Sequence, residues 1–170
     1  VTGAEKFAAD LYPAGLVWAG VKRPEYAHAR ILAIDTSRAS AIPGVLAVLT
    51  HRDISGKNRL GIFEKDQPIL ADDRVRHYGD AVALVVAETK DALADALAAI
   101  EVEYEPLPAV FDPAMALAAS APVLHPERPA GNLLLAAEII QGKGVAGLAD
   151  CEVKASFTMA LGWQEHAFLA

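Results

Sequence analysis

The chain has 170 residues, 54% of them hydrophobic, which is enough for one domain with an apolar core. Its net charge of −7 and scattered basic residues exclude the cationic stripe that nucleic-acid binding requires. No apolar run approaches the roughly 20 residues of a membrane-spanning helix, and residues 1–6 lack the pattern of a signal peptide.

The first half of the chain predicts a strand-helix-strand unit. Residues 16–21 and 29–34 are apolar, β-leaning runs that follow turn signals. Asp35, Thr36 and Ser37 can then cap a short helix, which Pro43-Gly44 ends before the β-run of residues 45–49.

A second unit of the same order begins near residue 81. Residues 82–87 are continuously apolar, as expected of a strand covered on both faces, and Thr89 can cap the following helix. That helix has one apolar face, formed by Leu93, Ala96, Leu97 and Ile100. Residues 101–105 then alternate, with Val102 and Tyr104 facing inward, until Pro106 and Pro108 end the strand.

These two units predict an α+β fold with a mixed sheet and packed helices. Residues 55–67 indicate an exposed loop, Asp112 can cap a short helix that starts at Pro113, and residues 122–131 are typical of a surface linker. Residues 133–140 and 151–161 are β-like and predict an antiparallel extension at the C-terminus.

Isolated motifs do not indicate a catalytic centre. A G-x-G-x-x-G pattern at residues 142–147 lacks the long helix that a dinucleotide site needs. The five histidines are far apart, without metal-ligand spacing, and are interpreted as surface or hydrogen-bonded side chains: His28, His51, His77, His125 and His166.

The single cysteine, Cys151, excludes an internal disulfide and is interpreted as a buried thiol; a cytoplasmic protein fits this composition best. Lys57-Asn58-Arg59 and Lys65 form the most basic stretch, either a solvated loop or a contact to an anionic partner or cofactor phosphate. Gln164, Glu165 and His166 form a compact polar group between apolar residues, so they should have buried partners.

Several segments, in this order, resemble one family. They are Val1-Thr2-Gly3-Ala4-Glu5-Lys6-Phe7, His28-Ala29-Arg30-Ile31, Ile34-Asp35-Thr36, Pro43-Gly44-Val45, Asp53-Ile54, Pro68-Ile69-Leu70-Ala71-Asp72-Asp73, Tyr78-Gly79-Asp80 and Val102-Glu103-Tyr104-Glu105-Pro106-Leu107-Pro108. The chain resembles the start of the molybdenum-binding part of the xanthine dehydrogenase and aldehyde oxidase family. Asp80 is a departure, since many members of that family have Gln there.

The resemblance implies an α/β hammerhead domain at residues 1–130 and the start of the adjoining molybdopterin-binding region at residues 131–170. It also implies a parent oxidoreductase that hydroxylates purines, N-heterocycles or aldehydes at molybdenum–molybdopterin, with iron–sulfur clusters and usually FAD in partner domains or subunits. The family's catalytic and pterin-binding segments lie beyond position 170, so we expect an inactive fragment without cofactor, and Gln164, Glu165 and His166 become candidates for the domain junction.

A second hypothesis is a stand-alone small-molecule-binding or hydrolytic α/β domain, which would need a preformed pocket with convergent polar groups.

Overall fold

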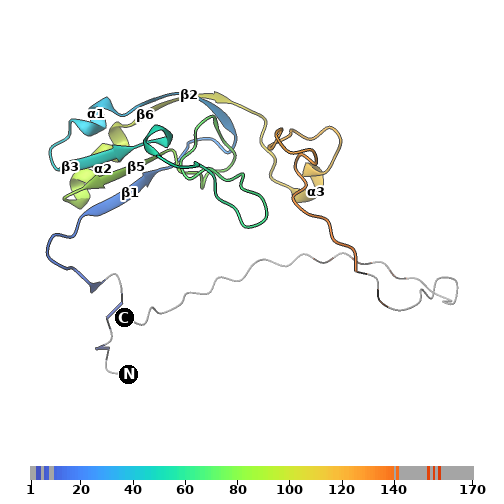
Figure 1. Cartoon of the computed structure of the whole chain (residues 1–170), viewed down its shortest axis with the longest axis horizontal. Helices are drawn as coiled ribbons and strands as arrows, with labels where there is room; N and C mark the ends of the chain where they lie inside the picture. Colours follow the sequence, from blue (N-terminus) through green and yellow to red (C-terminus); the bar gives the residue numbers. More distant parts are fainter. Residues whose placement is uncertain are drawn as a thin grey trace. The chain divides into compact units, whose positions relative to one another are not determined.

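The computed structural model describes residues 3–4, 6–7, 10–139, 141, 153, 155 and 157 (Figure 1). By its internal contacts the chain divides into two units. The larger unit is Gly15–Leu135 and contains the strands and helices named below. The smaller unit is Val1–Ala14 with Ala136–Ala170. In it, the Phe7 backbone N–H donates to the Asp10 carboxylate at 3.1 Å.

The larger unit is built on two three-stranded sheets. The first sheet has the order β1 (Trp18–Lys22), β5 (Ala83–Ala87), β3 (Val45–Leu49). The second has the order β4 (Arg74–Val75), β2 (Ala29–Asp35), β6 (Glu101–Pro106). Strand neighbours in both sheets are antiparallel. The α+β class is therefore confirmed, whereas the prediction of a mixed sheet is wrong.

The reason is that each strand-helix-strand unit places its two strands in different sheets. The chain runs from β2 through α1 (Ser37–Ser40) to β3, and from β5 through α2 (Lys90–Ala99) to β6. A parallel neighbour requires a crossover of about a dozen residues or more, and in the first unit the connecting residues 36–44 are too few. Antiparallel pairing of β2 with β6 and of β3 with β5 joins the two units instead.

The first core lies between α2 and the first sheet. Ala83, Val85 and Ala96 are fully buried there, and Leu93 and Leu97 pack beside them. Gly20 allows this approach, because a Cβ at that position would lie 3.0 Å from a Leu97 methyl carbon. The helix begins as predicted, with the Thr89 hydroxyl accepting the Ala92 N–H at 3.1 Å.

A second core lies against the second sheet. Its buried members are Ala29, Ala71, Val75 and Val82, and Ile31, Ile34, Val102 and Tyr104 pack against them. The inward orientation predicted for Val102 and Tyr104 is confirmed.

Of the three residues predicted to cap helix α1, Asp35 supplies the side-chain hydrogen bond. Thr36 occupies the N-cap position without a side-chain hydrogen bond, whereas the Asp35 carboxylate accepts the Ser37 N–H at 2.8 Å. The short helix η2 (His51–Asp53) has no counterpart in the predicted elements. Its capping box pairs the Thr50 backbone N–H with the Asp53 carboxylate at 2.7 Å.

Towards the C-terminus, α3 (Pro113–Ala116) begins as predicted, with the Asp112 carboxylate accepting the Met115 N–H at 2.9 Å. Residues 133–139 form no strand, in contrast to the predicted extension. A strand needs a hydrogen-bonding neighbour, and the proposed partner at residues 151–161 lies outside the described residues except for positions 153, 155 and 157. Among the residues that the structure describes, no helix is long and apolar enough to cross a membrane.

Candidate functional site

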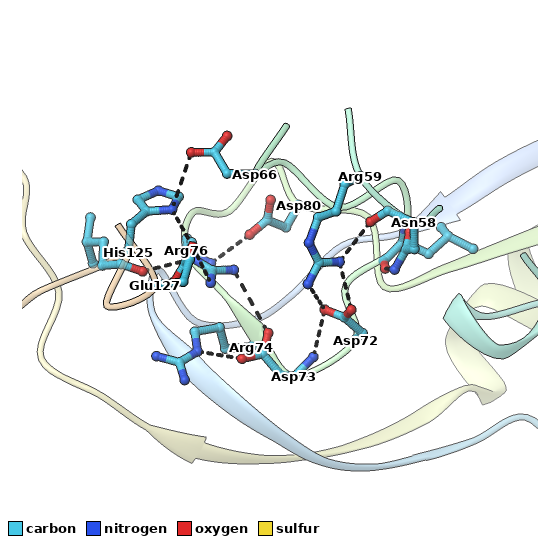
Figure 2. A network of polar contacts seen from close by, with 12 residues as sticks. Asn58, Arg59, Asp66, Asp72, Asp73, Arg74, Arg76, Asp80, His125 and Glu127 are labelled. Atoms are coloured by element: carbon cyan, nitrogen blue, oxygen red, sulfur yellow. Dashed lines mark hydrogen bonds and ion pairs between the residues drawn. The ribbon is translucent and has the colours of Figure 1, made fainter. Parts of the chain in front are cut away.

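The densest group of polar contacts joins the loops around β4 to residues 122–132, and Figure 2 shows its centre. We call it the loop network. It comprises Asn58, Arg59, Asp66, Asp72, Asp73, Arg74, Arg76, His77, Asp80, His125, Glu127 and Arg128.

Asn58 closes the loop of residues 55–67. Its side-chain oxygen accepts the backbone N–H groups of Ile69 and Leu70 at 3.0 and 3.1 Å, and its amide nitrogen donates to the Leu70 carbonyl at 2.7 Å. The side chain thus bonds to the backbone as a neighbouring strand would. An isolated bridge between Leu60 and Gln67 completes the loop.

Arg59 forms a bidentate ion pair with Asp72, and both residues are half-buried. Two guanidinium nitrogens donate to the two carboxylate oxygens at 2.7 and 3.2 Å. Burial opposes ionisation of Asp72, but the hydrogen bond and charge of Arg59 outweigh it, so the pKa of Asp72 lies below its ordinary value. Within the basic stretch, Lys57 and Lys65 are exposed, whereas Asn58 and Arg59 are half-buried. Only the two lysines are therefore available for the contact to an anionic partner or cofactor phosphate that the sequence suggested.

Asp80 closes the turn after β4. The residue is 6% exposed, and one carboxylate oxygen accepts the backbone N–H groups of Arg76 and His77 at 2.6 and 3.3 Å. The other oxygen lies 3.0 Å from His77 Nε2. The departure at position 80 therefore places a carboxylate where two backbone donors converge.

Residues 122–131 were predicted to be a surface linker, but polar contacts attach them to the loops around β4. His125 Nδ1 lies 3.1 Å from Glu127 and 3.5 Å from Asp66 (Figure 2). Arg128 pairs with Asp66 at 3.0 Å. Arg76 donates to the Leu124 carbonyl at 2.9 Å. Burial raises the pKa of Glu127, but a backbone hydrogen bond, His125 and Arg76 together lower it below its ordinary value.

His28, His77 and His125 match the predicted hydrogen-bonded or surface interpretation, whereas the buried Nδ1 of His51 has no hydrogen-bond partner among the described residues. His28 is buried and its Nδ1 lies 2.7 Å from the Pro108 carbonyl oxygen, while His77 and His125 join the loop network. His51 is half-buried within η2. The described part of the chain contains no group of three or more His, Cys, Asp or Glu side chains able to hold a metal ion.

The stand-alone hypothesis requires a pocket with free, convergent polar groups. One polar pocket does exist, lined in part by Thr36, His51, Asp53 and Asp72. Its two carboxylates, however, are engaged by the capping box of η2 and by Arg59. Neither carboxylate is therefore free to pair with His51 as an acid or base, and this hypothesis gains no support from the pocket.

Several predicted site features cannot be placed. Gln164, Glu165, His166, Cys151 and the glycine motif at residues 142–147 all lie outside the described residues. Conversely, no motif in the sequence pointed to the contacts that Asn58, Arg76 and Asp80 make. An asparagine in a turn-rich loop was a usable signal for Asn58, because its side chain readily bonds to nearby backbone.

Comparison with known proteins identifies the family. Residues 2–108 match the family model for the aldehyde oxidase and xanthine dehydrogenase a/b hammerhead domain. The chain is 41% identical over 169 residues to the nicotinate dehydrogenase large molybdopterin subunit of Eubacterium barkeri, covering 99% of this chain and 39% of that protein. It is 39% identical over 169 residues to a probable xanthine dehydrogenase subunit of Bacillus subtilis, covering 99% of this chain and 22% of that protein.

Solved structures agree. The aldehyde oxidoreductase from Desulfovibrio gigas superposes with a TM-score of 0.67 at 37% identity, over 73% of this chain and 15% of that one. A Cu,Mo-CO dehydrogenase gives a TM-score of 0.66 at 39% identity, over 72% of this chain and 16% of that one. The chain belongs to the aldehyde oxidase and xanthine dehydrogenase family, and it spans well under half the length of these relatives.

Proposed function

We propose that this chain is the structural hammerhead domain of a larger molybdopterin-dependent hydroxylase, whose active site lies in other parts of the parent protein. The observation that carries the proposal is the match over 99% of this chain to a large molybdopterin subunit of which it covers only 39%. The domain's task is to brace the cofactor-binding region, and the parent's substrates are purines, N-heterocycles or aldehydes.

The described residues do not fit a molybdopterin site. The charged side chains of the loop network are largely paired with one another, as Arg59 is with Asp72 and Arg128 with Asp66. We therefore assign molybdenum–molybdopterin to the remainder of the parent, where it supplies the hydroxylation chemistry when bound. Iron–sulfur clusters and FAD are assigned to partner domains or subunits, and the whole assembly to the cytoplasm.

Residues 131–170 are proposed to lead into the adjoining molybdopterin-binding region, with Gln164, Glu165 and His166 at the junction. These polar side chains lie between Trp163 and Phe168, and polar groups in such a setting require partners. In the full-length parent, Glu165→Ala or His166→Ala should reduce molybdenum content or turnover, whereas Lys57→Ala and Lys65→Ala serve as exposed controls. Wild-type molybdenum content and turnover in all four variants would contradict the assignment of Gln164, Glu165 and His166 to the junction.

The function itself is tested by assaying the full-length parent with a purine, nicotinate and an aldehyde in ¹⁸O-labelled water. The proposal expects oxidation of at least one substrate class with labelled oxygen in the product. A reading frame that ends shortly after Ala170, or a molybdenum-loaded parent inactive towards all three classes, would contradict it.

A further inference from the structure

The first sheet has an apolar face that no helix covers in the described part of the chain. Side chains alternate along each strand, and paired residues point to the same face. On the inner face, Gly20, Val85 and Val48 form one row across the sheet, beneath α2. The neighbouring rows point the other way, and they consist of Val21, Leu84 and Leu49, and of Ala19, Val86 and Ala47.

All six residues of this outer face are apolar. Ala19 and Leu49 are exposed, and the other four are half-buried. An antiparallel sheet with one solvated face normally alternates apolar and polar residues. The continuous apolar run of residues 82–87 predicted a strand covered on both faces. In the described residues a helix covers only one of these faces, the one that packs against α2.

The second sheet provides an internal comparison. Its outward rows pair Arg30 with Glu105, Ala33 with Glu103 and Asp35 with Glu101. Glu105 forms an ion pair with Arg30 at 2.8 Å, as expected of a face in water. Two sheets of the same size in one domain thus differ in their outer faces, one charged and one apolar.

The apolar face continues into the loops beside it. Ile54 and Ile69 join Val21, Leu49 and Leu84 around a hollow of about 310 Å³, whose lining also includes Thr50 and Asp53; Ile69 is 40% exposed. A concave surface lined mainly by apolar residues is typical of a contact site rather than of free surface.

We propose that this outer face, with its hollow, is a permanent interface covered by the remainder of the same polypeptide, the part of the parent beyond this domain. Interfaces that lack charged residues are typical of obligate contacts, whereas dissociable partners use surfaces about as polar as the rest of the protein. The covering segment must therefore be present whenever the domain folds. A covalently linked segment meets this need, since linkage gives it a high effective concentration.

The length of the relatives supports the same occupant. In the structures that this chain resembles, it corresponds to only 15–16% of the polypeptide, so most of each such chain lies outside the part matched here. The inference rests on the proposed function to the extent that it requires a longer parent chain.

A matched pair of alanines tests the proposal in the native, full-length parent. Ala19→Cys places a thiol on the apolar outer face and Ala33→Cys places one on the charged outer face of the second sheet; both alanines are exposed in the present structure. Alkylation of each introduced thiol is followed by mass spectrometry of its own peptide. We expect the thiol at position 19 to react at least about tenfold more slowly than the thiol at position 33, because a covered site reacts only through local opening.

Equal reactivity of the two thiols would overturn the proposal. A photo-crosslinking amino acid at position 19 then identifies the occupant. Products with parts of the same polypeptide outside this domain support the proposal, whereas products within the domain, with another subunit or with a second copy contradict it. A protected thiol in a parent without molybdenum would count against the proposed function alone. A reactive thiol in an active, molybdenum-loaded parent would count against this inference alone.

Discussion

The Asp80 carboxylate accepts the Arg76 backbone N–H at 2.6 Å, in a turn where Asp80 is 6% exposed. Removing the carboxylate deprives two part-buried backbone N–H groups of their acceptor. We expect Asp80→Ala to lower the free energy of unfolding by about 1–3 kcal/mol, and Asp80→Asn by less, because the amide oxygen remains an acceptor. Urea unfolding followed by circular dichroism measures both; equal stability of the alanine variant and the wild type would contradict this role.

The Arg59–Asp72 pair should make stability depend on acid pH. The pKa of Asp72 is lowered in the folded protein from its ordinary value of 3.8, so its contribution is present above that pH and is lost as the pH falls through the folded value. The unfolding free energy of the wild type should fall as the pH drops below about 4, and it should fall less steeply in Asp72→Asn and in Arg59→Met. Urea unfolding at a series of pH values tests this, and unchanged slopes in both variants would show that the pair is not coupled to folding.

Tyr104 should contribute to the alkaline limit of stability. Burial, helped by the charge of Glu25, raises the pKa of its phenol from 10.0 to about 12. The neutral form is thus favoured in the fold, and its contribution is present below pH 10 and is lost as the pH rises from about 10 to 12. Because the buried hydroxyl has no hydrogen-bond partner among the described residues, Tyr104→Phe should leave stability at neutral pH almost unchanged.

The measurement for Tyr104 is an absorbance titration of the phenols combined with unfolding at high pH. The Tyr104→Phe variant should lack the absorbance step near pH 12, and its unfolding free energy should fall less than that of the wild type between pH 10 and 12. A variant that retains that step would assign it to another tyrosine.

Val85→Asp should be severely destabilising, because Val85 is fully buried in the central strand of the first sheet. An unpaired charge there costs on the order of 5 kcal/mol, which is comparable with the stability of a whole domain. Ala33→Asp is the matched control, since Ala33 is exposed on the central strand of the second sheet. Thermal unfolding compares them, and similar melting temperatures would mean that the burial of Val85 is not essential.

Local patterns in the sequence predicted much of this fold. Capping by Thr89 and Asp112, the face of α2 and the inward orientation of Val102 and Tyr104 all depend on neighbours within a few residues, so they are visible in the sequence. The pairing of β2 with β6 joins residues far apart along the chain. Periodicity identifies such strands but contains no information on their partners, which is why the sheet arrangement was missed.

The loop network was harder to predict for the same reason. Arg76 donates to the carbonyl of Leu124, and Arg128 pairs with Asp66, so each contact joins segments that no local motif connects. Family membership was recognisable from the order of short segments, and two relatives match 99% of the chain at 41% and 39% identity.

The most direct test of the central claim is the molybdenum content of two purified proteins, the full-length parent and the 170-residue chain, both produced in a host that makes the pterin cofactor. Because the chain matches a large molybdopterin subunit, the parent should contain about one molybdenum per polypeptide. The described residues contain no group of side chains able to hold a metal ion, so we expect the chain alone to carry no stoichiometric molybdenum, iron or zinc, and we expect flavin to be absent as well. A chain that carries about one equivalent of any of these, or a parent that carries no molybdenum, would contradict the account.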